Sequence, residues 1–188
     1  MVLLSPERSI RRKVNEAIIS NVVGSATVGA AGTASTGGSL IGPTYSNLVD
    51  LEYSVTDAYR ASGSAGWLMR DSTAGRVRKL RDGAGGTEGA PLWQPSLDGG
   101  ISGLRTPDRL FGYPVFTDPN VASMASNAKI MQFGDWSAYY FRTVGALMVE
   151  RNDSVGFDTD QIHFRGKWRA AGGFQDLTAV NTMKASVS

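Results

Sequence analysis

The sequence has no cysteine, one histidine, and no apolar run approaching the length of a membrane-spanning helix. Without cysteine there is no disulfide, no thiolate zinc site and no cysteine nucleophile. A single histidine argues against most metal sites and against Ser-His-Asp catalysis. The N-terminus also lacks the charged, apolar and small segments of a secretion signal. We therefore expect a soluble, cytoplasmically made protein without metal, cofactor, membrane partner or catalytic residue.

A surplus of either charge is also missing. The 188 residues include 19 basic and 17 acidic side chains, a formal net charge of +2. This balance predicts no strong attraction to nucleic acid. The hydrophobic content of 41% suffices for the core of one domain, or of slightly more than one.

The clearest pattern that is present is a two-residue alternation in the last third of the chain. One face of an extended segment would carry Ile162, Phe164, Gly166 and Trp168, and the other His163, Arg165, Lys167 and Arg169. Turn-forming residues follow the upstream segment 146–151, so we predict a long two-stranded ribbon over Ala146–Ala170. An isolated ribbon is marginally stable in water. Its apolar face must therefore be covered by the rest of the chain or by a neighbouring copy.

Shorter patterns predict the remaining elements. We expect helices at Pro6–Val23, Thr44–Arg60 and Ala74–Arg81, and strands at Trp67–Met69, Leu110–Phe116 and Ile130–Phe133. Pro114 should confine its strand to an edge or a bulge. The Gly/Ala/Ser/Thr-rich segment 24–43 should be a mobile loop or a strand-like edge, and Gly172-Gly173 a turn. Helices and strands alternate without a regular βαβ repeat, so the predicted fold class is α+β.

Five segments follow one another in a characteristic order. They are Trp67–Leu80 with the Asp82-Gly83 turn; Leu92-Trp93-Gln94-Pro95-Ser96-Leu97; Leu110-Phe111-Gly112-Tyr113-Pro114-Val115; Phe133-Gly134-Asp135-Trp136; and the ribbon followed by Asp176–Val180. From Thr44 onward, this order resembles the major capsid protein of tailed double-stranded-DNA bacteriophages, which has the Hong Kong 97-type fold. The chain looks like a member that lacks the N-terminal arm and extended loop of the family.

The resemblance implies a domain division. Residues 1–24 would form the peripheral-domain helix, 25–43 a linker, 44–130 a mixed α/β axial domain and 131–171 the peripheral-domain ribbon. Residues 172–188 would return to the axial domain.

It also implies a structural role without enzyme activity. The chain would be a subunit of an icosahedral capsid, assembled in the host cytoplasm and enclosing packaged DNA in the virion. Its partners would be copies of itself in pentamers and hexamers, and scaffolding, portal or decoration proteins, with at most non-specific DNA contact. Some relatives crosslink their shells through residues at two positions of the ribbon. Our alignment puts Asp160 and Lys167 at these positions in place of the crosslinking residue types, so we expect no crosslinking. The alternatives are an encapsulin-like nanocompartment shell and a small hydrolase or carbohydrate-binding domain.

The candidate site residues are charged and belong to the ribbon. Arg165, Lys167 and Arg169 form a row suited to contact with another subunit, to solvation or, less well, to DNA, because the aromatic residues fall on the opposite face. Asp158 and Asp160 would share a strand face, as paired carboxylates or cation ligands do, or as a polar turn that pairs with basic groups. We predict intersubunit contact for all five of these residues.

Two further features could have a function or could be ordinary solvent-exposed residues. His163 could act as a general base, but as an exposed strand residue it needs no special role. The basic cluster Arg8, Arg11, Arg12 and Lys13 could contact nucleic acid or an acidic neighbour, although such runs on helices are usually solvated.

Overall fold

The computed structural model describes residues 6–31, 42–81, 89–95, 107–152, 154 and 162–185. The helices are α1 (Pro6–Ser25), α2 (Tyr45–Ser54), α3 (Asp57–Arg60), α4 (Asp71–Val77) and the 3-10 helix η2 (Trp136–Ala138). The strands are β1 (Thr27–Ala31), β2 (Ala65–Met69), β3 (Trp93–Gln94), β4 (Arg109–Leu110), β5 (Tyr113–Thr117), β6 (Lys129–Asp135), β7 (Tyr139–Asn152), β8 (His163–Phe174) and β9 (Val180–Lys184). The predicted α+β class is confirmed.

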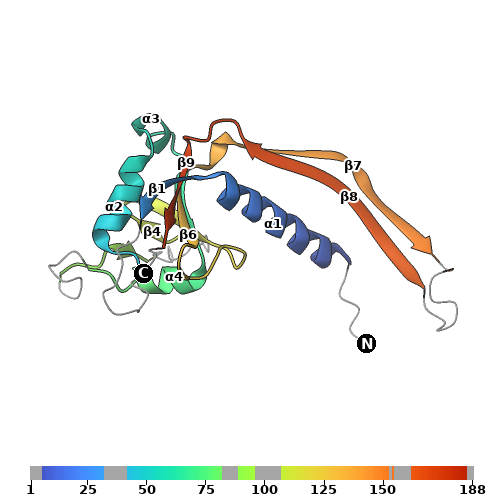
Figure 1. Ribbon diagram of the computed structural model, residues 1–188, viewed down its shortest axis with the longest axis horizontal. Coiled ribbons are helices and arrows are strands. Elements are labelled where there is room, and N and C mark those ends of the chain that lie inside the picture. The colour runs from blue at the N-terminus through green and yellow to red at the C-terminus, as the bar shows by residue number, and fades with distance from the viewer. Residues whose placement is uncertain are drawn as a thin grey trace, which may run out of the picture.

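These elements make a body and an arm. The body is a seven-stranded sheet in the order β1-β9-β6-β2-β5-β4-β3, with α2, α3 and α4 around it. The arm is the two-stranded ribbon β7-β8, and α1 runs outward from the body beside it (Figure 1). The sheet is mixed, because β1 pairs parallel to β9 and β2 parallel to β5, while the other neighbours are antiparallel.

The main core lies between the sheet and α2. Leu48 and Leu51 of α2 are fully buried against Trp67 of β2 and Phe133 of β6, whose ring centroids are 4.4 Å apart. The Trp67 indole donates a hydrogen bond to the Leu110 carbonyl (3.1 Å), so its polar atom is satisfied inside the core. Every residue of β2 is buried, which explains why its sequence is a continuous apolar run and does not alternate.

The Phe-Gly-Asp-Trp segment has structural roles at the base of the arm. The Asp135 carboxylate caps η2 by accepting hydrogen bonds from the backbone N–H (2.8 Å) and hydroxyl (2.7 Å) of Ser137. Burial acts to raise the pKa of Asp135, but hydrogen bonds from Ser137 and Ser62 outweigh it and leave the pKa below its ordinary value. The Trp136 indole donates to the Gly66 carbonyl (3.1 Å), which ties η2 to β2.

The structure corrects the predicted helix boundaries. Residues 44–60 form two helices, because Val55 and Thr56 are extended and end the capped helix α2. Thr44 and Asn47 make the capping box that starts α2. The predicted helix Ala74–Arg81 instead spans Asp71–Val77, since the Arg70 carbonyl already accepts the first helical hydrogen bonds.

Three predictions about strands and turns are wrong. Leu110–Phe116 is interrupted at Phe111 (φ 52°) and Gly112 (φ 84°), which turn β4 back onto β5. Strand β5 is not an edge, but Pro114 faces only β4, because pairing with β2 begins at Val115. Gly172-Gly173 lies inside β8 and is not a turn. In the 24–43 segment, the strand-like edge is confirmed for β1, while residues 32–41 lie outside the described residues.

Candidate interface on the ribbon and the first helix

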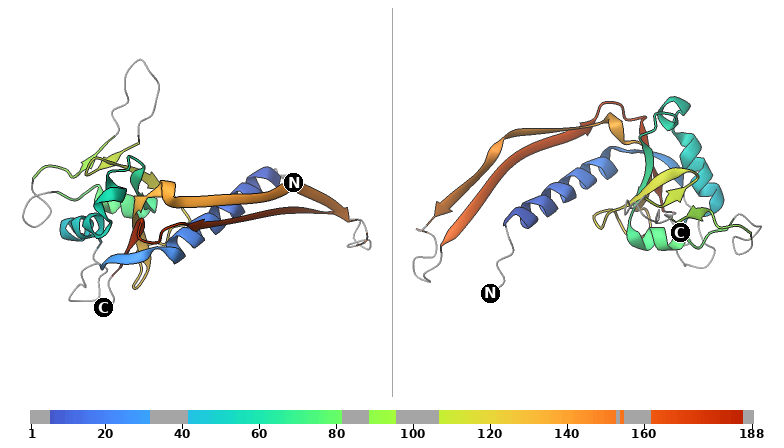
Figure 2. Two further views of the ribbon diagram at one scale, coloured as in Figure 1. Left: turned by 90° about the horizontal axis from the view of Figure 1, so that it is seen from above. Right: turned by 180° about the vertical axis from the view of Figure 1, so that it is seen from behind.

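The ribbon is longer at its base than the sequence indicated. It begins at Tyr139 and ends at Phe174, and its strands are 14 and 12 residues long. The antiparallel register shifts between Val144 and Met148, where Gly145 has a φ of 77°. Such a bulge bends a ribbon and increases its twist. Figures 1 and 2 show the ribbon arching away from the body, with its far end well beyond the sheet.

Helix α1 is fixed to the body through its C-terminal half. Ile19 and Val22 are buried against Leu68 of β2 and Val121. The Lys129 ammonium donates hydrogen bonds to the carbonyls of Val23 (2.8 Å), Gly24 (3.1 Å) and Ala26 (2.9 Å). A cation that binds the last carbonyls of a helix satisfies orphan acceptors and complements the helix dipole. This lysine therefore holds the helix end on β6.

Replacing this lysine should loosen α1. We expect Lys129→Met to lower the free energy of unfolding by about 1–3 kcal/mol at pH 7, because two carbonyls in the last turn of α1 and the Ala26 carbonyl just after it lose a charged donor. Urea unfolding measures the loss, and hydrogen exchange should accelerate in the last turn of α1. Lys79→Met removes an exposed lysine and is the matched control, expected within about 0.5 kcal/mol of the parent. Equal effects of the two variants would contradict the capping role.

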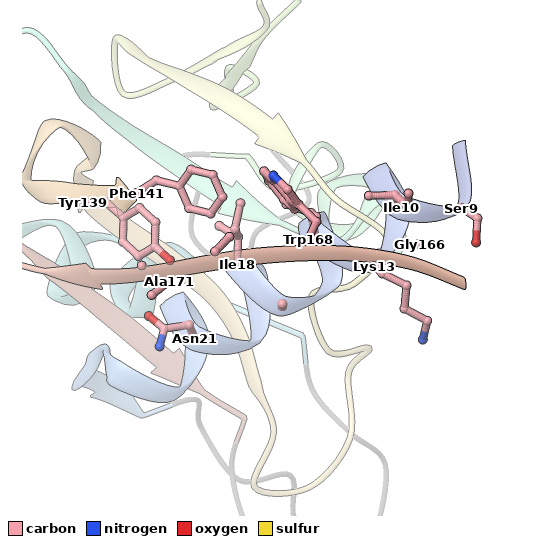
Figure 3. A pocket seen from close by; sticks show the side chains of 14 residues that line it. Ser9, Ile10, Lys13, Ile18, Asn21, Tyr139, Phe141, Gly166, Trp168 and Ala171 are labelled. Carbon is pink, nitrogen blue, oxygen red and sulfur yellow. The ribbon is translucent and has the colours of Figure 1, made fainter. Parts of the chain in front are cut away.

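Residues from Ser9 to Asn21 of α1 face the ribbon across a largely apolar groove. The groove contains two open cavities of about 580 and 480 Å³. Ile10, Val14 and Ile18 of α1 line both cavities, together with Trp168 of β8. The ring of Trp168 lies 6.0 Å from that of Phe141 on β7, centroid to centroid. Figure 3 shows side chains of α1, β7 and β8 around this space.

Small residues on β8 keep the groove open. Gly166 lies opposite Ile10, and a Cβ there would be 3.5 Å from the Ile10 methyl group, an ordinary contact distance. Ala170, Ala171 and Gly172 continue the lining toward the body. The groove is therefore a largely apolar trough between α1 and β8, with Ser9, Lys13 and Asn21 as the polar residues of the larger cavity.

The apolar face is left uncovered toward the far end of the ribbon. Val149, Ile162 and Phe164 are 62%, 52% and 68% exposed. Within the described residues, the face that the alternation predicted to be buried is therefore covered only in part, with Gly166 close to Ile10 of α1 and these three side chains largely exposed. An exposed apolar group of this kind is typical of an interaction surface.

The basic row occupies the opposite, outer face as predicted. Arg165 and Lys167 both bind Glu150 of β7, at 2.9 and 2.8 Å. Arg165 and Lys167 therefore share an ion-pair partner, Glu150, within their own chain. Among the residues that the structure describes, Arg169 and the nearby Arg142 make no ion pair. His163 is exposed at the far end of β8, opposite Asn152. Asp158 and Asp160 lie outside the described residues.

The Glu150 carboxylate should titrate below its ordinary pKa of 4.5, because it accepts hydrogen bonds from Lys167 and Arg165. A depressed carboxylate pKa stabilises the fold above the unfolded pKa, and this contribution disappears as the pH falls through the folded value. We expect a side-chain NMR titration to give a pKa below 4.5 and Lys167→Met to move it upward. An unchanged pKa in this variant would contradict the pairing, whereas Lys79→Met should leave it unchanged.

Among the residues described, no group of histidine, aspartate and glutamate side chains is arranged to hold a metal ion. In the same part of the chain, no helix combines the length and the apolar character needed to cross a membrane.

The comparison with known proteins gives a family. The sequence model of the phage capsid family matches residues 7–185. The chain belongs to the phage capsid family. No curated protein is similar enough in sequence to match it.

Solved capsid structures share the fold. The capsid of an empty GTA particle is 29% identical, with a TM-score of 0.58 over 86% of this chain and 48% of that one. The capsid of a native GTA particle is also 29% identical, with a TM-score of 0.57 over 86% and 53%. The structure from Mycobacterium phage Che8 is 16% identical, with a TM-score of 0.59 over 94% and 60%. This capsid-family chain thus spans about half of each GTA capsid chain, and its Hong Kong 97-type fold agrees with the resemblance in its sequence.

Sequence reasoning missed several residues that build this surface. Tyr139 and Phe141 lie upstream of the predicted ribbon Ala146–Ala170, although both line the groove. Lys129 had no distinguishing signal, because its role depends on carbonyls more than 100 positions earlier in the chain. The apolar positions of α1 were visible in their helical spacing, but nothing in that spacing indicated that Ile10 and Val14 face a ribbon.

Proposed function

We propose that this chain is a structural subunit of a phage or phage-like capsid, which assembles with copies of itself into a shell around double-stranded DNA. The observation that carries the proposal is the arm. A ribbon and a helix project from the body with an open apolar groove between them and exposed apolar side chains beyond it. Such an arm gains stability when other subunits cover it.

The related capsids support this assignment. Two structures at 29% identity are capsids of GTA particles, both described with C5 symmetry. By analogy, copies of this chain would meet around fivefold positions and, in a larger shell, sixfold positions. Closed shells need repeated interfaces of modest strength, because many weak contacts add up while misplaced subunits can still dissociate.

The domain assignment is part of the same proposal. Residues 44–130 and the C-terminal segment 172–188 would form the axial domain, and α1 with the segment 131–171, which contains most of the ribbon, the peripheral domain, joined by the 25–43 linker. The chain would act without catalysis and be located in the virion after assembly in the host cytoplasm. Scaffolding, portal or decoration proteins would be further partners. The nanocompartment and the small hydrolase are not favoured, since the similar structures named above are capsid and phage structures.

Purified particles test the function. Cells that carry the gene should release particles in which peptides of this chain form the largest share of the protein, measured by mass spectrometry after density-gradient banding. The particles should also contain nuclease-protected double-stranded DNA. Particles without DNA but with an enclosed enzyme would support the nanocompartment instead. Absence of the chain from all particle fractions would overturn the proposal.

A further inference from the structure

The rim of the groove is basic. Lys13 lines the larger cavity and Arg11 the smaller one, so the two cations flank the apolar row Ile10 and Val14 on opposite sides. Arg11 makes no ion pair within the described part of the chain, whereas Lys13 contacts Glu16 at 3.0 Å with both side chains largely exposed. Exposed pairs of this kind exchange readily for another acidic partner. The groove is therefore suited to a segment that is both apolar and acidic.

One segment of the chain has this composition. Residues 153–161, which connect β7 to β8, read Asp-Ser-Val-Gly-Phe-Asp-Thr-Asp-Gln. They include three aspartates and the apolar Val155 and Phe157, and they have no basic residue. The outer-face cations Arg169 and Arg142 also make no ion pair among the described residues, but neither lines an apolar cavity of the groove. Of the surfaces described above, the groove is therefore the one that offers this segment both cations and an apolar lining.

We propose that the groove between α1 and the ribbon of one subunit binds the 153–161 segment of a second copy. Val155 and Phe157 would enter the apolar trough, and Asp158 and Asp160 would contact Arg11 and Lys13. The uncovered side chains Val149, Ile162 and Phe164 lie next to this segment in the sequence or across the ribbon, and they would be buried in the same contact. This inference rests on the proposed function, because it assumes that copies of the chain associate.

The absence of cysteine makes this contact directly testable. Ala17 lines the larger cavity and is exposed, so Ala17→Cys places a thiol in the groove with little disturbance. Ser20 is exposed on the same helix but does not line the groove, which makes Ser20→Cys the matched control. Each variant is mixed with a separate population of Val155→Cys and oxidised mildly. The product is a disulfide-linked dimer on a non-reducing gel, twice the 20.0 kDa chain mass.

We expect the Ala17→Cys mixture to give at least about ten times more mixed dimer than the Ser20→Cys mixture, since the docked segment concentrates one thiol beside the other. Equal yields would overturn the docking. A double variant, Ala17→Cys with Val155→Cys, distinguishes the source of the segment. Closure to a disulfide-linked monomer at high dilution would show that the chain binds its own segment and would overturn the second-copy assignment.

Charge reversal tests the rim independently. Arg11→Glu combined with Lys13→Glu should reduce the dimer yield about tenfold, because like charges would meet. Asp158→Arg with Asp160→Arg in the other population should restore the yield. If the loss came from misfolding of the Arg11→Glu and Lys13→Glu variant, a change in the other population could not restore it. Arg12→Glu, on the same helix but outside the groove lining, should leave the yield unchanged. Failure of the restoration would overturn the ionic contact.

The two proposals fail in different ways. If light scattering shows association but the cysteines introduced at positions 17 and 155 do not form a disulfide, the docking is wrong and the shell function stands. If the chain stays monomeric throughout, both are overturned for this chain.

Discussion

Trp67→Ala should lower the free energy of unfolding by about 3–5 kcal/mol, a large part of the stability of a domain of this size. Trp67 is completely buried and packs against Phe133 in a tilted arrangement and against Phe111 edge to face, with ring centroids at 4.4 and 6.3 Å. Alanine would leave a cavity in the centre of the main core. It would also leave the Leu110 carbonyl without its indole donor. Urea unfolding followed by circular dichroism measures the change.

Trp168 provides the control for this substitution. It is half-buried in the groove of the arm, where no sheet core surrounds it. We expect Trp168→Ala to lower the free energy of unfolding much less, by about 1 kcal/mol, because a partly exposed side chain loses less burial. Equal losses in the free energy of unfolding for Trp67→Ala and Trp168→Ala would contradict the arrangement of the core described above.

Gly134→Ala should be as damaging, for a different physical reason. A Cβ at this position would lie 2.1 Å from the Ala179 carbonyl oxygen and 2.6 Å from the Val180 Cα. Both are backbone atoms, one just before β9 and one in its first residue, where β9 pairs with β6, so the strands would have to separate. The φ of 156° adds strain for any side chain. We expect a loss of about 3 kcal/mol or more in the free energy of unfolding, or no folded protein.

Gly75→Ala is the matched change in open space. Gly75 lies in α4, and an added Cβ would have no neighbour within 4 Å. Alanine favours a helix over glycine by about 0.5–1 kcal/mol, so this variant should be slightly more stable than the parent. If Gly134→Ala unfolds at the same denaturant concentration as Gly75→Ala, the close approach of β6 and β9 is wrong.

Local sequence patterns predicted the elements in which the burial of the side chains follows a regular pattern along the sequence. The alternation at residues 162–169 identified β8 because one face of the ribbon is basic and the other apolar. The helical spacing from Ile10 to Val22 identified α1 to within two residues at its end. The continuous apolar run at Trp67 identified β2, since a strand buried on both faces has no polar positions.

The failures occurred where distant contacts decide the structure. Gly172-Gly173 read as a turn, but its pairing with Tyr140 and Phe141 keeps it in β8, and the Tyr139 side chain fills the space beside Gly172. Glu150 was missed as the partner of Arg165 and Lys167, because only the cross-strand register brings both cations to it; the intersubunit contact of these two residues stays a prediction. Neither the register nor the position of α1 can be deduced from composition, because both follow from tertiary packing.

The proposed function depends most on self-association, so the decisive measurement is the solution mass of the purified chain. Size exclusion with light scattering, and negative-stain images of any large fraction, would give it. We expect species many times heavier than the 20.0 kDa chain, with rings or closed shells in the images. A single species of 20.0 kDa at every concentration tested would contradict it, because the apolar groove and the exposed end of the ribbon would then remain in water.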